Sequence, residues 1–254
     1  MASGTTMFPW PNRIRDARWQ WRGEVHQLRV SEPERATANH GLVRTRRFDV
    51  TAHSDESVTL STTVMGEPGF PFAVRFSVTY TALAAGVAVT YRALNIGDRD
   101  APVAVGAHPY LRIGDSTADD TVLHVPARTL LELDDRLLPV AERAVAGSIN
   151  EPHRLGVRGR QLNHCYGDFA SVDGGGFIHR LSAPNGQTLE LRTDDRFRWL
   201  QVYTCDSFIR DGRTVRAIAL EPMTAPPDAF NSQRDVATVA PGDEWQATWS
   251  IVLV

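Results

Sequence analysis

The sequence predicts an all-β protein, a large antiparallel β-sandwich with few and short helices. Three observations lead to this fold class. Apolar and polar residues alternate with a period of two from one end of the chain to the other, as in strands with one buried face. Clusters of Gly, Asn, Asp and Pro, such as PNG and DGGG, separate many of these runs. No apolar stripe with the 3.6-residue period of a helix extends beyond three turns.

The clearest strand lies at residues 72–80, FAVRFSVTY, where Phe72, Val74, Phe76, Val78 and Tyr80 share one face. Similar patterns predict strands, in chain order, at 87–94, 121–127, 177–183, 188–193, 198–204 and 245–253. More than a dozen strands without intervening helices favour two packed sheets. There is no repeat of fixed period, which argues against a propeller, and no Pro/Ser-rich linker. We therefore expect residues 1–254 to form a single domain.

Composition narrows the class of partner. The chain has 254 residues and a formal net charge of only -3, with no long block of like charge, so neither nucleic acid nor an anionic membrane is an expected partner. All 27 basic residues are arginine, which we attribute mainly to codon usage. Two cysteines, Cys165 and Cys205, fit free buried thiols in a reducing compartment better than a disulfide framework. Without an apolar run long enough to span a membrane or a signal-like N-terminus, we expect a cytoplasmic protein that binds a small molecule.

Five stretches place polar residues at strand ends or inside strands: PWPNRI (9–14), NHGLVR (39–44), GAHPYL (106–111), RWLQVYT (198–204) and ALEPMTAPPDAFNS (219–232). Taken singly, each has an ordinary structural explanation, such as a solvated turn or a loop histidine. The proline after His108 favours an extended backbone there. Glu221 follows four apolar residues, so it is either a surface strand end or a functional carboxylate, because burial without a partner is costly.

Together and in this order, these motifs resemble the aldose 1-epimerases (galactose mutarotases), especially their bacterial branch with HGLVR and EPMT-PP-AFN motifs. The resemblance runs from residue 9 to the C-terminus, and the last motif is the most specific. It implies that branch's large β-sandwich, with a sugar in an open cleft on one sheet. His108 matches the family's general acid and Glu221 its general base. Asn12, Arg13, His40 and Gln201 match positions that bind the sugar hydroxyls and the ring oxygen.

The implied reaction explains these residue types. Interconversion of α and β anomers removes the proton of the C1 hydroxyl and protonates the ring oxygen, so one base and one acid must flank the hemiacetal. No metal, nucleotide or redox cofactor is needed. Trp10, Tyr110 or Tyr203 could cover an apolar sugar face.

Two features depart from the family pattern. The family usually has several strands before its PNRI-like motif, whereas here the motif begins close to Met1. We therefore expect missing N-terminal edge strands or a misplaced start, with a monomer or a homodimer as the assembly. Asn163 stands where the family commonly has an aspartate. It keeps a carbonyl acceptor for a sugar hydroxyl but lacks the charge, for which Asp168 could compensate.

Other functions stay open at this point. A hexose with a phosphate or sulfonate group would use arginines near the motifs, the candidates being Arg15, Arg18, Arg44, Arg46 and Arg47. A carbohydrate-binding or regulatory module would keep the cleft without turnover, although it has no need of an acid facing a base. A glycoside hydrolase would need a second carboxylate, which the motifs lack. The eight histidines show no HxH or HxxxH spacing, so we expect no metal site.

Overall fold

A computed structural model describes residues 3–147 and 151–254 as two large antiparallel sheets packed face to face. The first sheet has the order β1-β11-β21-β20-β17-β14-β15, with β12 also pairing with β21. Its strands are β1 (Thr6–Met7), β11 (Gly106–Ala107), β12 (Tyr110–Leu111), β14 (Ala127–Leu133), β15 (Pro139–Ala144), β17 (Asn163–Phe169), β20 (Trp199–Arg210) and β21 (Arg213–Met223).

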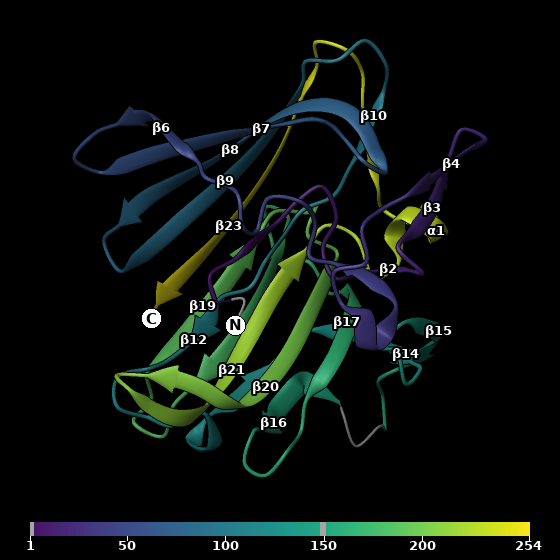
Figure 1. Cartoon of the computed structure of the whole chain (residues 1–254). Coiled ribbons are helices and arrows are strands. Elements are labelled where there is room, and N and C mark those ends of the chain that lie inside the picture. The colour runs from purple at the N-terminus through teal and green to yellow at the C-terminus, as the bar shows by residue number, and fades with distance from the viewer. Residues whose placement is uncertain (1–2, 148–150) are drawn as a thin grey trace.

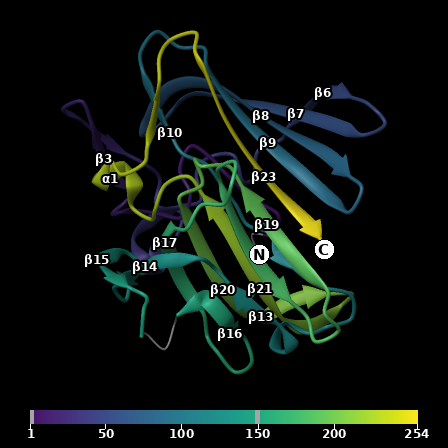
Figure 2. The same ribbon diagram turned by 180° about the vertical axis from the view of Figure 1, so that it is seen from behind.

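The second sheet has the order β16-β13-β18-β19-β23-β9-β8-β7-β6. Its strands are β6 (Asp49–His53), β7 (Ser57–Glu67), β8 (Phe70–Leu83), β9 (Gly86–Asn95), β13 (Val122–His124), β16 (Leu155–Gly156), β18 (Phe177–Ser182), β19 (Thr188–Thr193) and β23 (Glu244–Leu253). Figure 2 shows β19 and β23 of this sheet from behind.

Three two-stranded ribbons complete the β structure: β2 (Arg13–Arg15) with β5 (Thr37–Asn39), β3 (Arg18–Trp21) with β4 (Glu24–Gln27), and β10 (Ala101–Val103) with β22 (Ala237–Val239). Helix within residues 3–147 and 151–254 is confined to α1 (Ala229–Ser232) and the 3₁₀ turns η1 (Pro33–Arg35), η2 (Ala118–Asp120) and η3 (Pro152–Arg154). The predicted large β-sandwich with few short helices is therefore confirmed.

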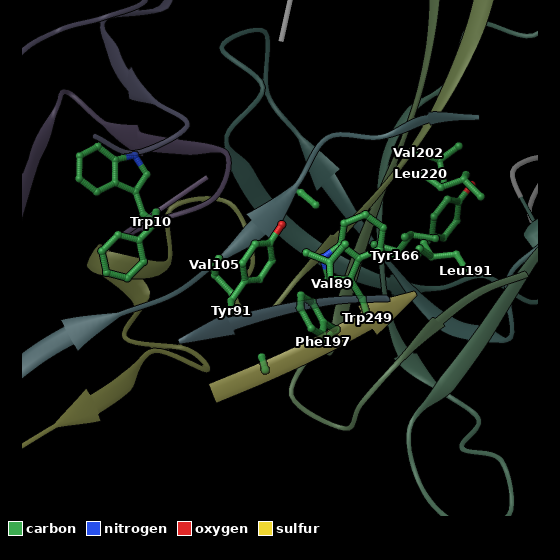
Figure 3. Close-up of a cluster of buried hydrophobic side chains, with 14 of the residues drawn as sticks. Trp10, Val89, Tyr91, Val105, Tyr166, Leu191, Phe197, Val202, Leu220 and Trp249 are labelled. Atoms are coloured by element: carbon green, nitrogen blue, oxygen red, sulfur yellow. The ribbon is translucent and has the colours of Figure 1, made fainter. Parts of the chain in front are cut away.

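The main core lies between the sheets, and the alternation of the sequence builds it. Leu220 of β21 and Val202 of β20 point inward from the first sheet, while Leu191 of β19 and Trp249 of β23 come from the second (Figure 3). In β8 the predicted face of Phe72, Val74, Phe76 and Val78 is buried, as expected.

The hairpin of β20 and β21 extends further than the pattern at 198–204 predicted. A register shift between Cys205 and Phe208 lets β20 continue to Arg210. Asp211 and Gly212 both have positive φ and close a two-residue turn, the geometry that joins twisted antiparallel strands most easily. This long hairpin carries site residues at one end and reaches well past them at the other (Figure 1).

Candidate active site

Glu221 lies near the end of β21 and faces away from the sandwich core. It pairs with Gln201 of β20, whereas the neighbouring pair, Leu200 with Pro222, points to the opposite face. The Glu221 side chain is only 3% exposed. The carboxylate is therefore buried on the outer face of the first sheet and is not a surface strand end.

His108 lies opposite Glu221, in the short link between β11 and β12. Its backbone N–H donates to the carbonyl of Thr5 and its carbonyl accepts from the N–H of Gly4, so the N-terminal segment holds the link on both sides. The imidazole Nε2 is 3.2 Å from Oε1 of Glu221. An acid–base pair is thus formed by residues that are more than a hundred positions apart in the sequence.

Burial acts on both members of this pair. It raises the pKa of Glu221 to about 8, against a smaller lowering by the nearby Arg13 charge. Burial also lowers the pKa of His108 to about 4. Between these values the two side chains together hold one proton, which their contact lets them share. At these pKa values the shared proton lies on Glu221 and His108 is neutral, and the positive charge of Arg13 works in the other direction, toward ionised Glu221.

His40 is the second histidine of the site, with its ring centre 5.7 Å from that of His108. Its φ of 62° and that of Gly41, 71°, turn the chain sharply after β5, and the His40 N–H donates to the carbonyl of Asn12. Gly41 is required here because a Cβ would lie 2.2 Å from the Phe8 carbonyl oxygen. Burial, followed by the charges of His108 and arginines, holds the pKa of His40 well below its usual range. His40 is therefore neutral and suited to hydrogen bonding.

The remaining candidates form one chain of polar contacts across three elements. Arg13 Nη1 donates to Asn12 Oδ1 at 3.2 Å, and Asn12 Nδ2 donates to Gln201 Oε1 at 3.5 Å. Gln201 Nε2 donates to Asn163 Oδ1 at 2.7 Å. All seven site residues expected from the sequence motifs are thus brought to one face of the first sheet.

Glu32 is a member of this network that the sequence did not reveal. It holds Arg13 through two bonds, from Nε at 2.6 Å and from Nη2 at 2.9 Å. Thr37 Oγ1 and Arg35 Nη1 also donate to its carboxylate. Burial opposes ionisation, but the bonds from Arg13 and Thr37 outweigh it and lower the pKa of Glu32. The Arg13 fork is therefore fixed by an ionised carboxylate, with Nη1 left to face Asn12.

Aromatic side chains flank His108. The Tyr110 ring stacks on it with 5.1 Å between centres, and the Tyr203 ring approaches edge-on at 6.5 Å. The expectation that Trp10 could cover a sugar face was wrong. Its indole is 1% exposed, packs against Phe230 and donates to the Ala38 carbonyl. Tyr110 and Tyr203, both half-buried, are the aromatic residues beside the acid–base pair.

Three of the arginines considered for an anion pocket form ion pairs with acidic side chains. Arg15, Arg46 and Arg47 pair with Asp228, Glu67 and Asp49. The charge of Arg44, in contrast, acts on His40 and lowers its pKa.

Asp168 does not compensate for Asn163. It lies at the other end of β17 and pairs with Arg128, and its side chain is 55% exposed.

Other expectations from composition can be compared with the same residues. Cys165 and Cys205 are both free and buried, as expected. Among the described residues, no three His, Cys, Asp or Glu side chains are grouped so that they could hold a metal ion. No helix in the described part of the chain is long and apolar enough to cross a membrane.

Fold and site together define a β-sandwich protein with a buried acid–base pair beside a set of neutral and cationic hydrogen-bonding groups. The chain belongs to the aldose 1-epimerase family, whose model matches residues 1–252. The resemblance read from the motifs is thereby confirmed, and the protein is an isomerase of this family.

Known proteins support the same placement. The chain is 29% identical over 241 residues to the uncharacterized protein YihR of Escherichia coli (strain K12), covering 94% of this chain and 75% of that one. Its fold is similar to a GalM/aldose epimerase homologue from C. elegans, with a TM-score of 0.86, 20% identity, and coverage of 100% and 82% of the two chains. It is also similar to galactose 1-epimerase from Lactobacillus acidophilus NCFM, with a TM-score of 0.78, 18% identity, and coverage of 98% and 79%.

Proposed function

We propose that this aldose 1-epimerase interconverts the α and β anomers of a hexose, with Glu221 as general base and His108 as general acid. The observation that carries the assignment is the buried contact of 3.2 Å between His108 Nε2 and Glu221 Oε1. One group with a raised pKa and one with a lowered pKa hold a single proton between them near neutral pH. These pKa values leave the proton on Glu221, so the proposed roles require it to pass to His108 across the 3.2 Å contact, and the positive charge of Arg13 favours that transfer.

Ring opening moves two protons. Glu221 takes the proton of the C1 hydroxyl while the C1–O5 bond breaks, and His108 gives its proton to O5. The product is the open-chain aldehyde with a hydroxyl on C5. Each positioned proton transfer accelerates the reaction by roughly 10²–10⁴-fold.

Ring closure reverses these steps on the other face of the aldehyde. After rotation about the C1–C2 bond, the C5 hydroxyl attacks C1 and returns its proton to His108, while Glu221 returns its proton to O1. Both groups regain their starting protonation state, so no external reactant is consumed.

The polar chain beside the pair fits a neutral sugar. Arg13 supplies a fixed cationic donor, and Asn12, Gln201 and Asn163 each offer both amide donors and a carbonyl acceptor for hydroxyl groups. Neutral His40 adds a ring nitrogen beside His108, which faces O5 in this proposal. We therefore propose these five residues as the groups that orient the hexose.

The location of the enzyme follows from a different observation. Its two cysteines are free and buried. This supports a reducing compartment, and we propose the cytoplasm.

The test is anomer exchange by NMR with glucose and galactose, comparing wild-type protein with Glu221→Gln, which keeps the size of the side chain. We expect wild-type protein to accelerate exchange of at least one hexose and Glu221→Gln to lose most of it. Glu24→Gln is a matched control because Glu24 is 63% exposed in β4. Folded wild-type protein that leaves exchange at the uncatalysed rate for both sugars would overturn the proposal.

A further inference from the structure

A cavity of about 480 Å³ lies between the β20–β21 hairpin and the segment that follows β12, and Tyr110, whose ring stacks on His108, is part of its lining. The hairpin contributes Phe208, Val215 and Ala217, the segment contributes Thr117 and Ala118, and Tyr110 stands at the boundary. Its volume falls within the roughly 300–1,000 Å³ usual for small-molecule sites.

Tyr110 connects this cavity with the acid–base pair. The Tyr110 ring contacts the His108 ring, with 5.1 Å between their centres, and it also contacts the Phe208 ring, with 4.6 Å between centres. Tyr110 also pairs with Ala219, which shares the outer face of β21 with Glu221 and Ala217. At about 3.4 Å per residue, Ala217 lies roughly 14 Å along the strand from Glu221. That span matches a substrate of two sugar units.

The cavity lining favours a neutral ligand with apolar faces. Tyr110 and Phe208 offer ring surfaces, and Val215 and Ala217 add an apolar floor. Three arginines also line the cavity, but each has a carboxylate close by: Arg216 with Asp119 at 3.2 Å, Arg112 with Asp115 at 2.9 Å, and Arg210 with Asp211 at 3.9 Å. Sugar rings combine apolar C–H faces with hydroxyl groups, which this mixture of rings and paired polar groups suits.

The position of the cavity relative to His108 and Glu221 indicates which sugar substituent would enter it. In the proposed function, Glu221 faces O1 and His108 faces O5. In the sugar ring, C5 with its C6 group is bonded to O5. In the protein, Tyr110 stacks on His108 and the cavity lies on the far side of Tyr110. A substituent on O6 would therefore enter the cavity.

We propose that this cavity is a subsite for a glycosyl unit attached to O6 of the reducing hexose, so that the enzyme acts on 1→6-linked disaccharides as well as free hexoses. The inference rests on the proposed function, because the roles of Glu221 and His108 set the direction of the sugar. Phe208 and Tyr110 would stack against the second ring.

The experiment compares anomer exchange of isomaltose, maltose and glucose, with glucose 6-phosphate as an anionic alternative. We expect kcat/KM for isomaltose to exceed that for glucose by about tenfold, as one aromatic stacking contact would give, and maltose to show no such gain. Phe208→Ala should bring the ratio of isomaltose to glucose close to one. Ile209→Ala is the matched control, because Ile209 is the adjacent residue and is 58% exposed.

Equal kcat/KM for isomaltose and glucose, or a ratio that Phe208→Ala does not change, would overturn the subsite. A preference for glucose 6-phosphate over isomaltose would overturn it in favour of an anion pocket.

Affinities from ligand-observed NMR separate this inference from the proposed function. If no sugar shows accelerated exchange, the proposed function fails, while isomaltose binding about tenfold tighter than glucose, and dependent on Phe208, still supports the cavity as a glycosyl site. Equal affinities would refute it.

Discussion

Glu32→Gln tests how the site holds Arg13. The Glu32 carboxylate accepts from Arg13 Nε at 2.6 Å and from Nη2 at 2.9 Å, and both side chains are only 12–13% exposed. Glutamine keeps the size and one carbonyl acceptor but removes the charge and one of these two acceptor oxygens. Losing a charge-assisted bond of this kind costs about 1.5–3 kcal/mol. We therefore expect a loss of stability of about 2 kcal/mol, which lowers the melting temperature by roughly 4–8 °C.

The same variant should change catalysis in a specific way. Arg13 that is less firmly held orients the sugar less well, so KM should rise. The charge of Arg13 lowers the pKa of Glu221. The ionised Glu32 carboxylate paired with Arg13 offsets part of that charge, and we expect it to weaken this effect. Removing the carboxylate should therefore move the alkaline limb of the pH–rate profile to lower pH.

The assay combines thermal unfolding followed by circular dichroism with anomer exchange by NMR between pH 5 and pH 9. Glu34→Gln is the control, because Glu34 lies in the same η1 turn and is 66% exposed. A Glu32→Gln protein with wild-type melting temperature, KM and alkaline limb would refute the reasoning that Glu32 fixes Arg13.

Two further predictions concern the pair and the core. The exchange rate should fall below about pH 4, where His108 and Glu221 are both protonated and no base remains, and above about pH 8, where neither carries a proton; a flat rate through pH 9 would contradict this. Leu220→Ala, at a fully buried position between the sheets, should lower the free energy of unfolding by roughly 2–5 kcal/mol in urea titration. Leu253→Ala, 40% exposed, should cost much less, and equal losses would argue against the core described here.

The fold could be predicted from the sequence because strand alternation is local. The face of Phe72, Val74 and Phe76 in β8 is visible in nine consecutive residues and is buried as expected. The hairpin extension to Arg210 was missed because the register shift after Cys205 breaks the alternation. The Asp211–Gly212 pair was a signal that could have revealed it.

The site was predicted through motifs and not through spacing. His108 and Glu221 meet because β11 and β12, on either side of His108, both pair with β21, a long-range contact that no local pattern contains. Glu32 was missed because an acidic residue in a short charged loop has no pattern that distinguishes it from a solvated one. Trp10 was assigned wrongly because an indole fits a core and a sugar face equally well from sequence alone.

The most direct test of the account measures kcat/KM for hexose anomer exchange in His108→Asn, in Glu221→Gln and in the protein carrying both changes. If the two side chains act as one proton-sharing pair, each single change removes most of the catalysis and the double change costs little more than either one. We expect losses of roughly 10²–10⁴-fold for each single variant. Losses that multiply in the double variant, or a single variant that keeps wild-type kcat/KM, would contradict the central claim.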